Sequence, residues 1–126
     1  MKFFKCEHCG NIIRFVKESG VPVMCCGEKM TELIPGITDG AAEKHVPVVK
    51  QTGDTVMVEV GAVEHPMVEA HYIQWIAIET TKGCQMIHLE YTDKPHAEFR
   101  LAEGEHFVAA YEYCNLHGLW MATAEN

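Results

Sequence analysis

Short runs of apolar, β-forming residues recur along residues 37–126 and are separated by turn residues. The segment Val56-Met57-Val58-Glu59-Val60 alternates apolar and polar positions, which predicts a half-buried strand, and Gln51-Thr52-Gly53-Asp54 predicts a hairpin turn before it. Thr81-Lys82-Gly83 and Asp93-Lys94-Pro95 interrupt later runs in the same way. The predicted strands are Val46 to Val49, Thr55 to Val60, Tyr72 to Thr80, Gln85 to Tyr91, Ala97 to Leu101, Phe107 to Tyr113 and Leu119 to Thr123. This pattern of short strands predicts an antiparallel β-sandwich.

The first 36 residues have a different character, with too few large apolar side chains to form a core. Segments shorter than about 40 residues generally need a metal, disulfides or a partner in order to fold. Turn residues and small residues are concentrated between Pro35 and Ala42, which predicts a linker. We therefore expect a mainly β protein with two parts, a small metal-stabilised module over residues 1–36 and a sandwich domain over residues 37–126.

Charge and hydropathy exclude two classes of partner. The chain has 126 residues with 10 Lys and Arg against 18 Asp and Glu, a net charge of −8, and no cluster of cations that could bind a nucleic-acid backbone. No stretch reaches the ~18 consecutive apolar residues of a membrane helix, and the first residues do not resemble a secretion signal. We therefore expect a cytoplasmic protein that binds neither nucleic acid nor membrane.

Four of the six cysteines form a metal-binding pattern. Cys6 and Cys9 are separated by two residues, and the adjacent pair Cys25 and Cys26 follows after fifteen more. Two tight turns can bring four thiolates into a tetrahedral site for zinc or iron, and the spacing alone does not choose between these metals. A pair of disulfides is the alternative, which a reducing compartment and the strain of bonding adjacent cysteines both disfavour.

Four of the eight histidines lie beside turns or strand ends, namely His45, His65, His71 and His117. Cys114 precedes the last of them by three residues, and imidazole with one thiolate suits iron or copper. Cys114, His117 and Met121 with one upstream histidine would match a blue-copper electron carrier, but that interpretation leaves at least two histidines unused. A site that uses all four histidines is the other interpretation.

Two sets of motifs resemble known families. The spacing of the four cysteines is similar to that of desulforedoxin, a small Fe(Cys)4 module, although a zinc ribbon stays possible. Four later segments resemble superoxide reductase. Together with the cysteine motif, they make the whole chain similar to the two-iron desulfoferrodoxin family. These segments are Glu43-Lys44-His45-Val46-Pro47, His65-Pro66-Met67, His71-Tyr72-Ile73-Gln74-Trp75 and Cys114-Asn115-Leu116-His117-Gly118-Leu119-Trp120.

The resemblance implies two mononuclear iron ions per chain and an immunoglobulin-like fold for the sandwich. It places one iron on Cys6, Cys9, Cys25 and Cys26. It places the second, catalytic iron in a plane of His45, His65, His71 and His117, with Cys114 as the axial ligand and the sixth position open. The implied activity is the one-electron reduction of superoxide to hydrogen peroxide, with electrons from a donor such as rubredoxin, and the implied assembly is a homodimer.

Two charged residues beside His45 are the predicted catalytic groups. Because the net charge of −8 repels superoxide, fast capture requires a local cation at the site, and Lys44 is the candidate. The resemblance gives Glu43 the role of a carboxylate that occupies the sixth position in the resting ferric state and helps to displace peroxide. Trp75 and Trp120 are expected to pack as apolar walls near the ligands.

Overall fold

The computed structural model describes residues 1–38 and 40–124. Its internal contacts divide the chain into two compact units, Met1–Ile34 and Pro35–Asn126. In the part of the chain that the structure describes, no helix has the length and apolar character needed to cross a membrane.

The N-terminal unit consists of short antiparallel strands around a very small core. A three-stranded sheet has the order β2-β1-β5, and a separate pair joins β3 to β4. Phe3 and Met30 are buried, and the rings of Phe4 and Phe15 meet edge to face with centroids 5.2 Å apart. So few buried apolar side chains agree with the expectation that this unit depends on a metal. Its strands are β1 (Phe3–Lys5), β2 (Ile12–Ile13), β3 (Met24–Cys25), β4 (Glu28–Lys29) and β5 (Thr31–Leu33).

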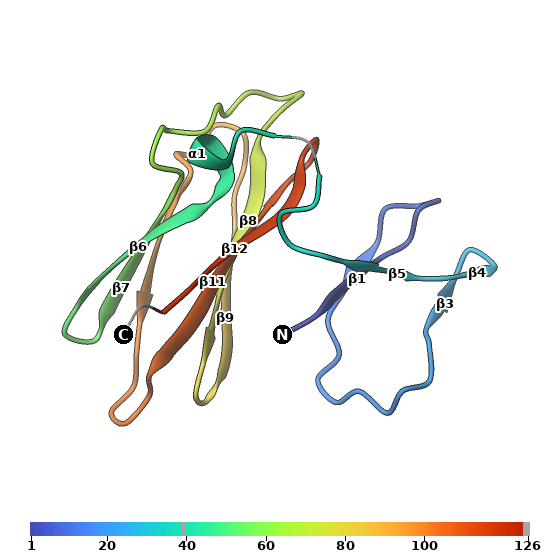
Figure 1. The fold of residues 1–126 in the computed structure, drawn as a ribbon, viewed down its shortest axis with the longest axis horizontal. Coiled ribbons are helices and arrows are strands. Elements are labelled where there is room, and N and C mark those ends of the chain that lie inside the picture. The colour runs from blue at the N-terminus through green and yellow to red at the C-terminus, as the bar shows by residue number, and fades with distance from the viewer. Residues whose placement is uncertain (39, 125–126) are drawn as a thin grey trace. The chain divides into compact units, whose positions relative to one another are not determined.

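The C-terminal unit is an antiparallel, immunoglobulin-like β-sandwich, as predicted (Figure 1). One sheet has the order β10-β7-β6 and the other the order β12-β11-β8-β9. A single turn of helix, α1 (Ala42–His45), precedes the first strand and lies at one end of the sandwich. The strands are β6 (Pro47–Thr52), β7 (Thr55–Val60), β8 (Ile73–Thr80), β9 (Gly83–His88), β10 (His96–Arg100), β11 (Phe107–Cys114) and β12 (Gly118–Thr123).

The core lies between the two sheets. Val56, Val58 and Val60 of β7 are fully buried, as the alternation of that segment predicts, and they pack with Ile76 and Ile78 of β8 in one apolar cluster. Each of the seven predicted strands corresponds to an observed strand, although their ends differ by a few residues. The hairpin between β6 and β7 turns at Gly53, whose φ of 61° is readily adopted by glycine.

One predicted strand extends too far. The run Gln85 to Tyr91 was expected to be extended throughout, but β9 ends at His88. A turn follows because Asp93 Oδ2 accepts a hydrogen bond from the backbone N–H of Glu90 at 2.8 Å, and the Asp93 N–H donates to the Glu90 carbonyl at 3.0 Å. A local aspartate turn therefore prevails over the β propensity of this segment.

Candidate metal centres

The four N-terminal cysteines converge in what we call the cysteine cluster, which comprises Cys6, Cys9, Cys25 and Cys26. The four sulfur atoms all lie within 4.8 Å of one another. Cys6 follows β1, and its turn is closed by a hydrogen bond from the Gly10 N–H to the Cys6 carbonyl at 2.9 Å. None of the six cysteines is in a disulfide, so the disulfide alternative is not what the structure shows. Four converging sulfurs form the donor set that zinc and iron prefer.

Hydrogen bonds to sulfur distinguish the four thiols. The backbone N–H of Cys9 donates to Cys6 Sγ at 3.5 Å, and the backbone N–H groups of Cys9 and His8 lower the pKa of Cys6 to about 6. The pKa of Cys26 is raised to about 12, because the neighbouring sulfurs of Cys6 and Cys9 act against its ionisation. Asn11 Nδ2 also donates to Cys25 Sγ at 3.7 Å. Four thiolates at this separation repel one another, and a bound cation offsets that repulsion.

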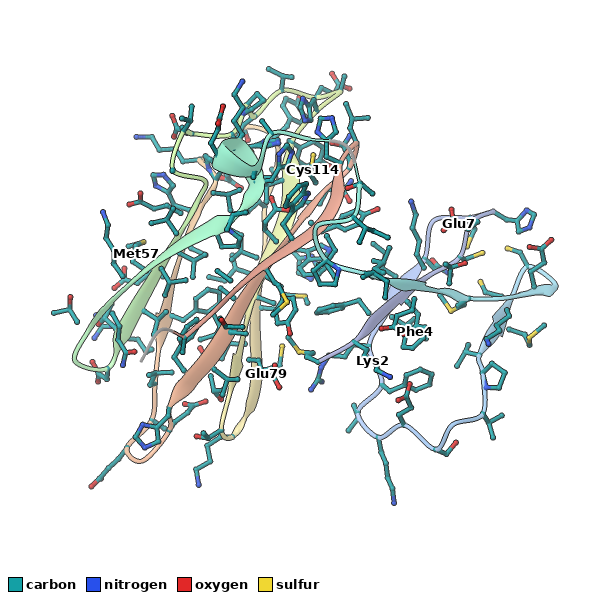
Figure 2. All side chains as sticks on the ribbon, in the orientation of Figure 1. Lys2, Phe4, Glu7, Met57, Glu79 and Cys114 are labelled. Atoms are coloured by element: carbon teal, nitrogen blue, oxygen red, sulfur yellow. The ribbon has the colours of Figure 1, made fainter. Side chains whose placement is uncertain are left out.

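Five residues from separate segments of the sandwich form the second group, which we call the histidine cluster. It comprises His45, His65, His71, Cys114 and His117, whose ligand atoms all lie within 4.8 Å of one another. His45 ends α1, and Cys114 ends β11 near α1 (Figure 2). His65 and His71 lie between β7 and β8, and His117 directly precedes β12. All four histidines predicted as ligands therefore meet at one end of the sandwich.

Backbone carbonyls orient two of the imidazoles. His45 Nδ1 donates to the carbonyl of Ala41 at 2.8 Å, and His65 Nδ1 donates to the carbonyl of Pro66 at 2.7 Å. Because a carbonyl oxygen only accepts, both Nδ1 atoms carry the ring proton, and both Nε2 atoms keep a lone pair. Such hydrogen bonds are typical of histidines that bind a metal through the other ring nitrogen.

The arrangement of these lone pairs fits a cation. His45 Nε2 lies 3.1 Å from His65 Nε2 and 3.1 Å from His117 Nδ1. Since neither His45 nor His65 has a proton on Nε2, these two atoms do not hydrogen-bond to each other. His71 Nε2 is buried and has no hydrogen-bond partner among the described residues. Unpaired buried nitrogens are costly, and a metal ion between them would satisfy all of them.

Burial favours the neutral form of three histidines of the cluster. It is the main cause that lowers the pKa values of His45 and His71, and it lowers that of His65 to about 4. Burial also raises the pKa of Cys114, while the backbone N–H groups of His117 and Leu116 lower it. Neutral imidazoles can bind a metal without first losing a proton, whereas the thiol must lose one on binding.

Trp120 and Thr38 support this cluster from outside. The indole of Trp120 stacks on His45 with centroids 5.0 Å apart, and its Nε1 donates to the carbonyl of His117 at 2.9 Å. The hydroxyl of Thr38 donates to the same carbonyl. Trp75 is also buried and stacks on Tyr113 with centroids 5.8 Å apart. Trp120 is thus the apolar wall that the sequence predicts beside a ligand.

The blue-copper interpretation does not match this geometry. It uses Cys114, His117 and one upstream histidine, whereas the structure brings three upstream histidines to the same site. Met121, its proposed axial ligand, lies inside β12 opposite Tyr111. The donor set of four imidazoles and one thiolate is the one predicted for the iron site.

Glu43 and Lys44 lie in α1, next to His45, and both are exposed. The backbone carbonyl of Glu43 accepts a hydrogen bond from the Val63 N–H at 2.8 Å. The positive charge of Lys44 is the last in order of the causes that lower the pKa values of His45 and His71, after burial and the neighbouring imidazoles. The hydrogen bond between Glu43 and Val63 thus attaches the turn that carries both charged residues to the loop that follows β7.

Gly61, Glu112 and Asn115 are features of the site region that sequence reasoning missed. A Cβ on Gly61 would lie 2.7 Å from the carbonyl oxygen of Glu43, so only glycine allows the two segments to approach so closely. Glu112 is fully buried in β11, two residues before Cys114. Asn115 joins the segments that carry Cys114 and His71. The only sequence signal for Asn115 was its place beside a candidate ligand.

Both units match known protein families. The family model described as Desulfoferrodoxin matches residues 37–123, and the one described as Desulfoferrodoxin, N-terminal domain, matches residues 1–33. A desulfoferrodoxin of Syntrophotalea carbinolica is 44% identical over 120 residues, which are 95% of this chain and 94% of the relative.

Solved structures are similar over one or both units. The crystal structure of the superoxide reductase from Treponema pallidum has a TM-score of 0.82 and 37% identity, and the match covers 97% of this chain and 98% of that one. The superoxide reductase (1Fe-SOR) from Giardia intestinalis has a TM-score of 0.55 and 38% identity over 67% of this chain and 99% of its own.

Proposed function

The chain belongs to the desulfoferrodoxin family and is a superoxide reductase with two mononuclear iron sites, and we propose that Lys44 and Glu43 are its catalytic residues. The observation that carries this function is the convergence of four histidines and one cysteine on one point beside α1. The cysteine cluster holds the first iron as Fe(Cys)4, and the histidine cluster holds the second as Fe(His)4(Cys).

The reaction consumes one superoxide, one electron and two protons and forms one hydrogen peroxide. The five residues of the histidine cluster would hold an iron ion, which would supply the electron that superoxide needs. The protein supplies an approach route, because Cys114 is fully buried whereas Glu43 and Lys44 are exposed. Superoxide therefore arrives on the side of the cluster that faces α1.

Lys44 attracts the substrate. The whole chain has a charge of −8, which slows the approach of any anion, and a cation at the entrance counteracts this repulsion. Lys44 is adjacent to His45, and its charge acts on both His45 and His71. The ammonium thus concentrates superoxide beside the imidazoles.

Glu43 acts on the product. Its carboxylate is exposed and belongs to the same helical turn as Lys44. We assign it the displacement of peroxide from the site, since a carboxylate can take the place of an anionic product at a metal. In Glu43→Ala, the release of peroxide should slow while the first encounter with superoxide keeps its rate. An unchanged rate of peroxide release, measured by rapid mixing, would contradict this role.

Lys44→Ala tests the capture step. The second-order rate constant for reaction with superoxide, measured by pulse radiolysis, should fall about tenfold or more at low salt and depend less on ionic strength than in the unchanged protein. Lys50→Ala is the matched control, because it removes an exposed lysine from β6 with the same change in net charge. Equal rate constants for Lys44→Ala and the unchanged protein across a salt series would refute steering by Lys44.

Rubredoxin or a similar small iron protein is proposed as the electron donor, and the protein thus takes part in electron transport. Reduced rubredoxin should be oxidised when superoxide and the protein are both present, and failure to do so would exclude this donor. We also propose a homodimer, whose mass by sedimentation equilibrium should be twice the 14.2 kDa of one chain. A mass of 14.2 kDa would contradict it.

A cytoplasmic location and a division into residues 1–36 and 37–126 complete the proposal. Six free thiols suit a reducing compartment, and cell fractionation would test the location. Limited proteolysis should cut first near residue 36, because turn residues and small residues concentrate there. First cleavage inside either part would contradict this boundary.

A further inference from the structure

Asn115 joins two of the segments that make the histidine cluster. Its Oδ1 accepts a hydrogen bond from the backbone N–H of Tyr72 at 2.9 Å, and its Nδ2 donates to the carbonyl of Ala70 at 3.0 Å. The backbone N–H of Asn115 also donates to the carbonyl of Tyr72 at 3.3 Å. One side chain therefore holds the residues on both sides of His71.

The ring of His71 lacks the kind of hydrogen bond that orients the rings of His45 and His65. The rings of His45 and His65 are each oriented by a hydrogen bond from Nδ1 to a backbone carbonyl. No hydrogen bond orients the ring of His71 within the described residues, and its buried Nε2 has no partner. The orientation of this imidazole must therefore come from its backbone and from packing against the rings of His65 and His117, whose centroids lie 4.7 Å and 5.0 Å away.

The backbone around His71 is a tight loop. Val68 and His71 exchange two backbone hydrogen bonds, each 3.0 Å long, which close the loop on its N-terminal side. Beyond the loop, β8 begins at Ile73, which pairs with Cys114 in the sheet. Asn115 lies directly after Cys114, so it connects this loop to the strand end that supplies the thiolate.

We propose that Asn115 is a positioning residue for His71 and sets the affinity of the histidine cluster for iron. Asn115 fixes the backbone on both sides of His71, whereas His45 and His65 are oriented by a hydrogen bond on the ring itself. Loss of such an outer partner typically lowers metal affinity 10- to 100-fold. If Asn115 only stabilised the loop, its loss would destabilise the sandwich and would have no specific effect on the affinity for iron. The proposal rests on His71 as an iron ligand and does not depend on the reaction with superoxide.

Iron affinity in the full-length chain separates these two roles. In Asn115→Ala, the dissociation constant for ferrous iron at the histidine cluster, measured by competition with a coloured chelator, should rise about 10- to 100-fold. The iron of the cysteine cluster should stay at one per chain and serves as an internal reference. Gln85→Ala is the matched control, because Gln85 Nε2 also donates to a backbone carbonyl, that of Arg100, at 2.8 Å.

Thermal unfolding adds a readout that does not depend on turnover. Iron should raise the melting temperature of Gln85→Ala as much as that of the unchanged chain, and should raise that of Asn115→Ala less. An unchanged iron affinity in Asn115→Ala, or the same loss in Gln85→Ala, would overturn the proposal. If Asn115→Ala does not fold, Asn115→Ser, which is too short to reach both backbone groups, gives the same test.

A double-mutant cycle tests whether Asn115 acts through His71. In a His71→Ala background, Asn115→Ala should cause no further loss of iron affinity, because the ligand that it positions is already absent. A further loss as large as in the single variant would show that Asn115 does not act through His71. These binding measurements use no superoxide, so they distinguish failure of this proposal from failure of the catalytic roles of Lys44 and Glu43.

Discussion

Glu112 should make the stability of the protein fall as the pH rises above about 4.5. The side chain is 0% exposed in β11, between Trp120 and Ile76 of the neighbouring strands. Neither carboxylate oxygen has a hydrogen-bond partner among the described residues, and burial raises the pKa well above its ordinary value of 4.5. The folded chain therefore keeps a proton that the unfolded chain loses.

The size of this effect follows from proton linkage. Wherever the native state binds one proton more than the unfolded state, each pH unit lowers the free energy of unfolding by about 1.4 kcal/mol. Glu112→Gln has nearly the same shape but does not ionise, so it lacks this loss. Between pH 5 and about 6.5, the variant should gain about 2 kcal/mol over the unchanged protein. For a domain of about 90 residues, this corresponds to on the order of 10 °C in melting temperature.

Circular dichroism melts at the two pH values measure this difference. Both proteins are loaded with iron and checked for equal iron content, so that the protonation of the ligands affects them equally. The neutral acid and the amide both leave buried polar atoms without partners, so this cost largely cancels. Glu103→Gln, at an exposed position, is the control. Its melting temperature should differ from that of the unchanged protein by the same amount at both pH values. If Glu112 were ionised in the folded protein, the melting temperature of Glu112→Gln would also differ from that of the unchanged protein by the same amount at both pH values. That result would refute the reasoning.

Two further predictions concern the histidine cluster and its surroundings. In the iron-free protein, the pKa of His65 is about 4 against an ordinary value of 6.5, so the unfolded state binds more protons between these pH values. In the iron-free Glu112→Gln variant, which removes the opposite effect of Glu112, the free energy of unfolding in urea should therefore fall by up to about 3 kcal/mol as the pH drops from 6.5 to 4, and a flat profile would contradict the burial of a neutral His65. Gly61→Ala should destabilise the protein by about 1–3 kcal/mol, because the new Cβ would lie 2.7 Å from the carbonyl oxygen of Glu43. An unchanged melting temperature would show that the two segments separate without cost.

Local patterns were sufficient for much of the fold and for the ligands. The alternation of Val56, Val58 and Val60 predicts a strand with one buried face, because successive side chains of a strand point to opposite sides. The cysteine cluster was also readable, since each pair of thiols comes from one tight turn whose geometry depends on neighbouring residues. The histidines were found only as candidates near turns, and the resemblance to a family was needed to group them.

The sequence by itself determined which groups are available for iron, whereas the tertiary structure decided how they are held. Glu112 has the sequence character of an exposed acid, but it shares one face of β11 with the core residues Ala110 and Cys114, so it lies in the interior of the sandwich. Gly61 and Glu43 are far apart in the chain and meet only because α1 packs on the loop after β7. Asn115 reaches across 45 residues of sequence to Ala70. Such contacts depend on the pairing of distant strands, and no periodicity within one segment records which strand lies beside it.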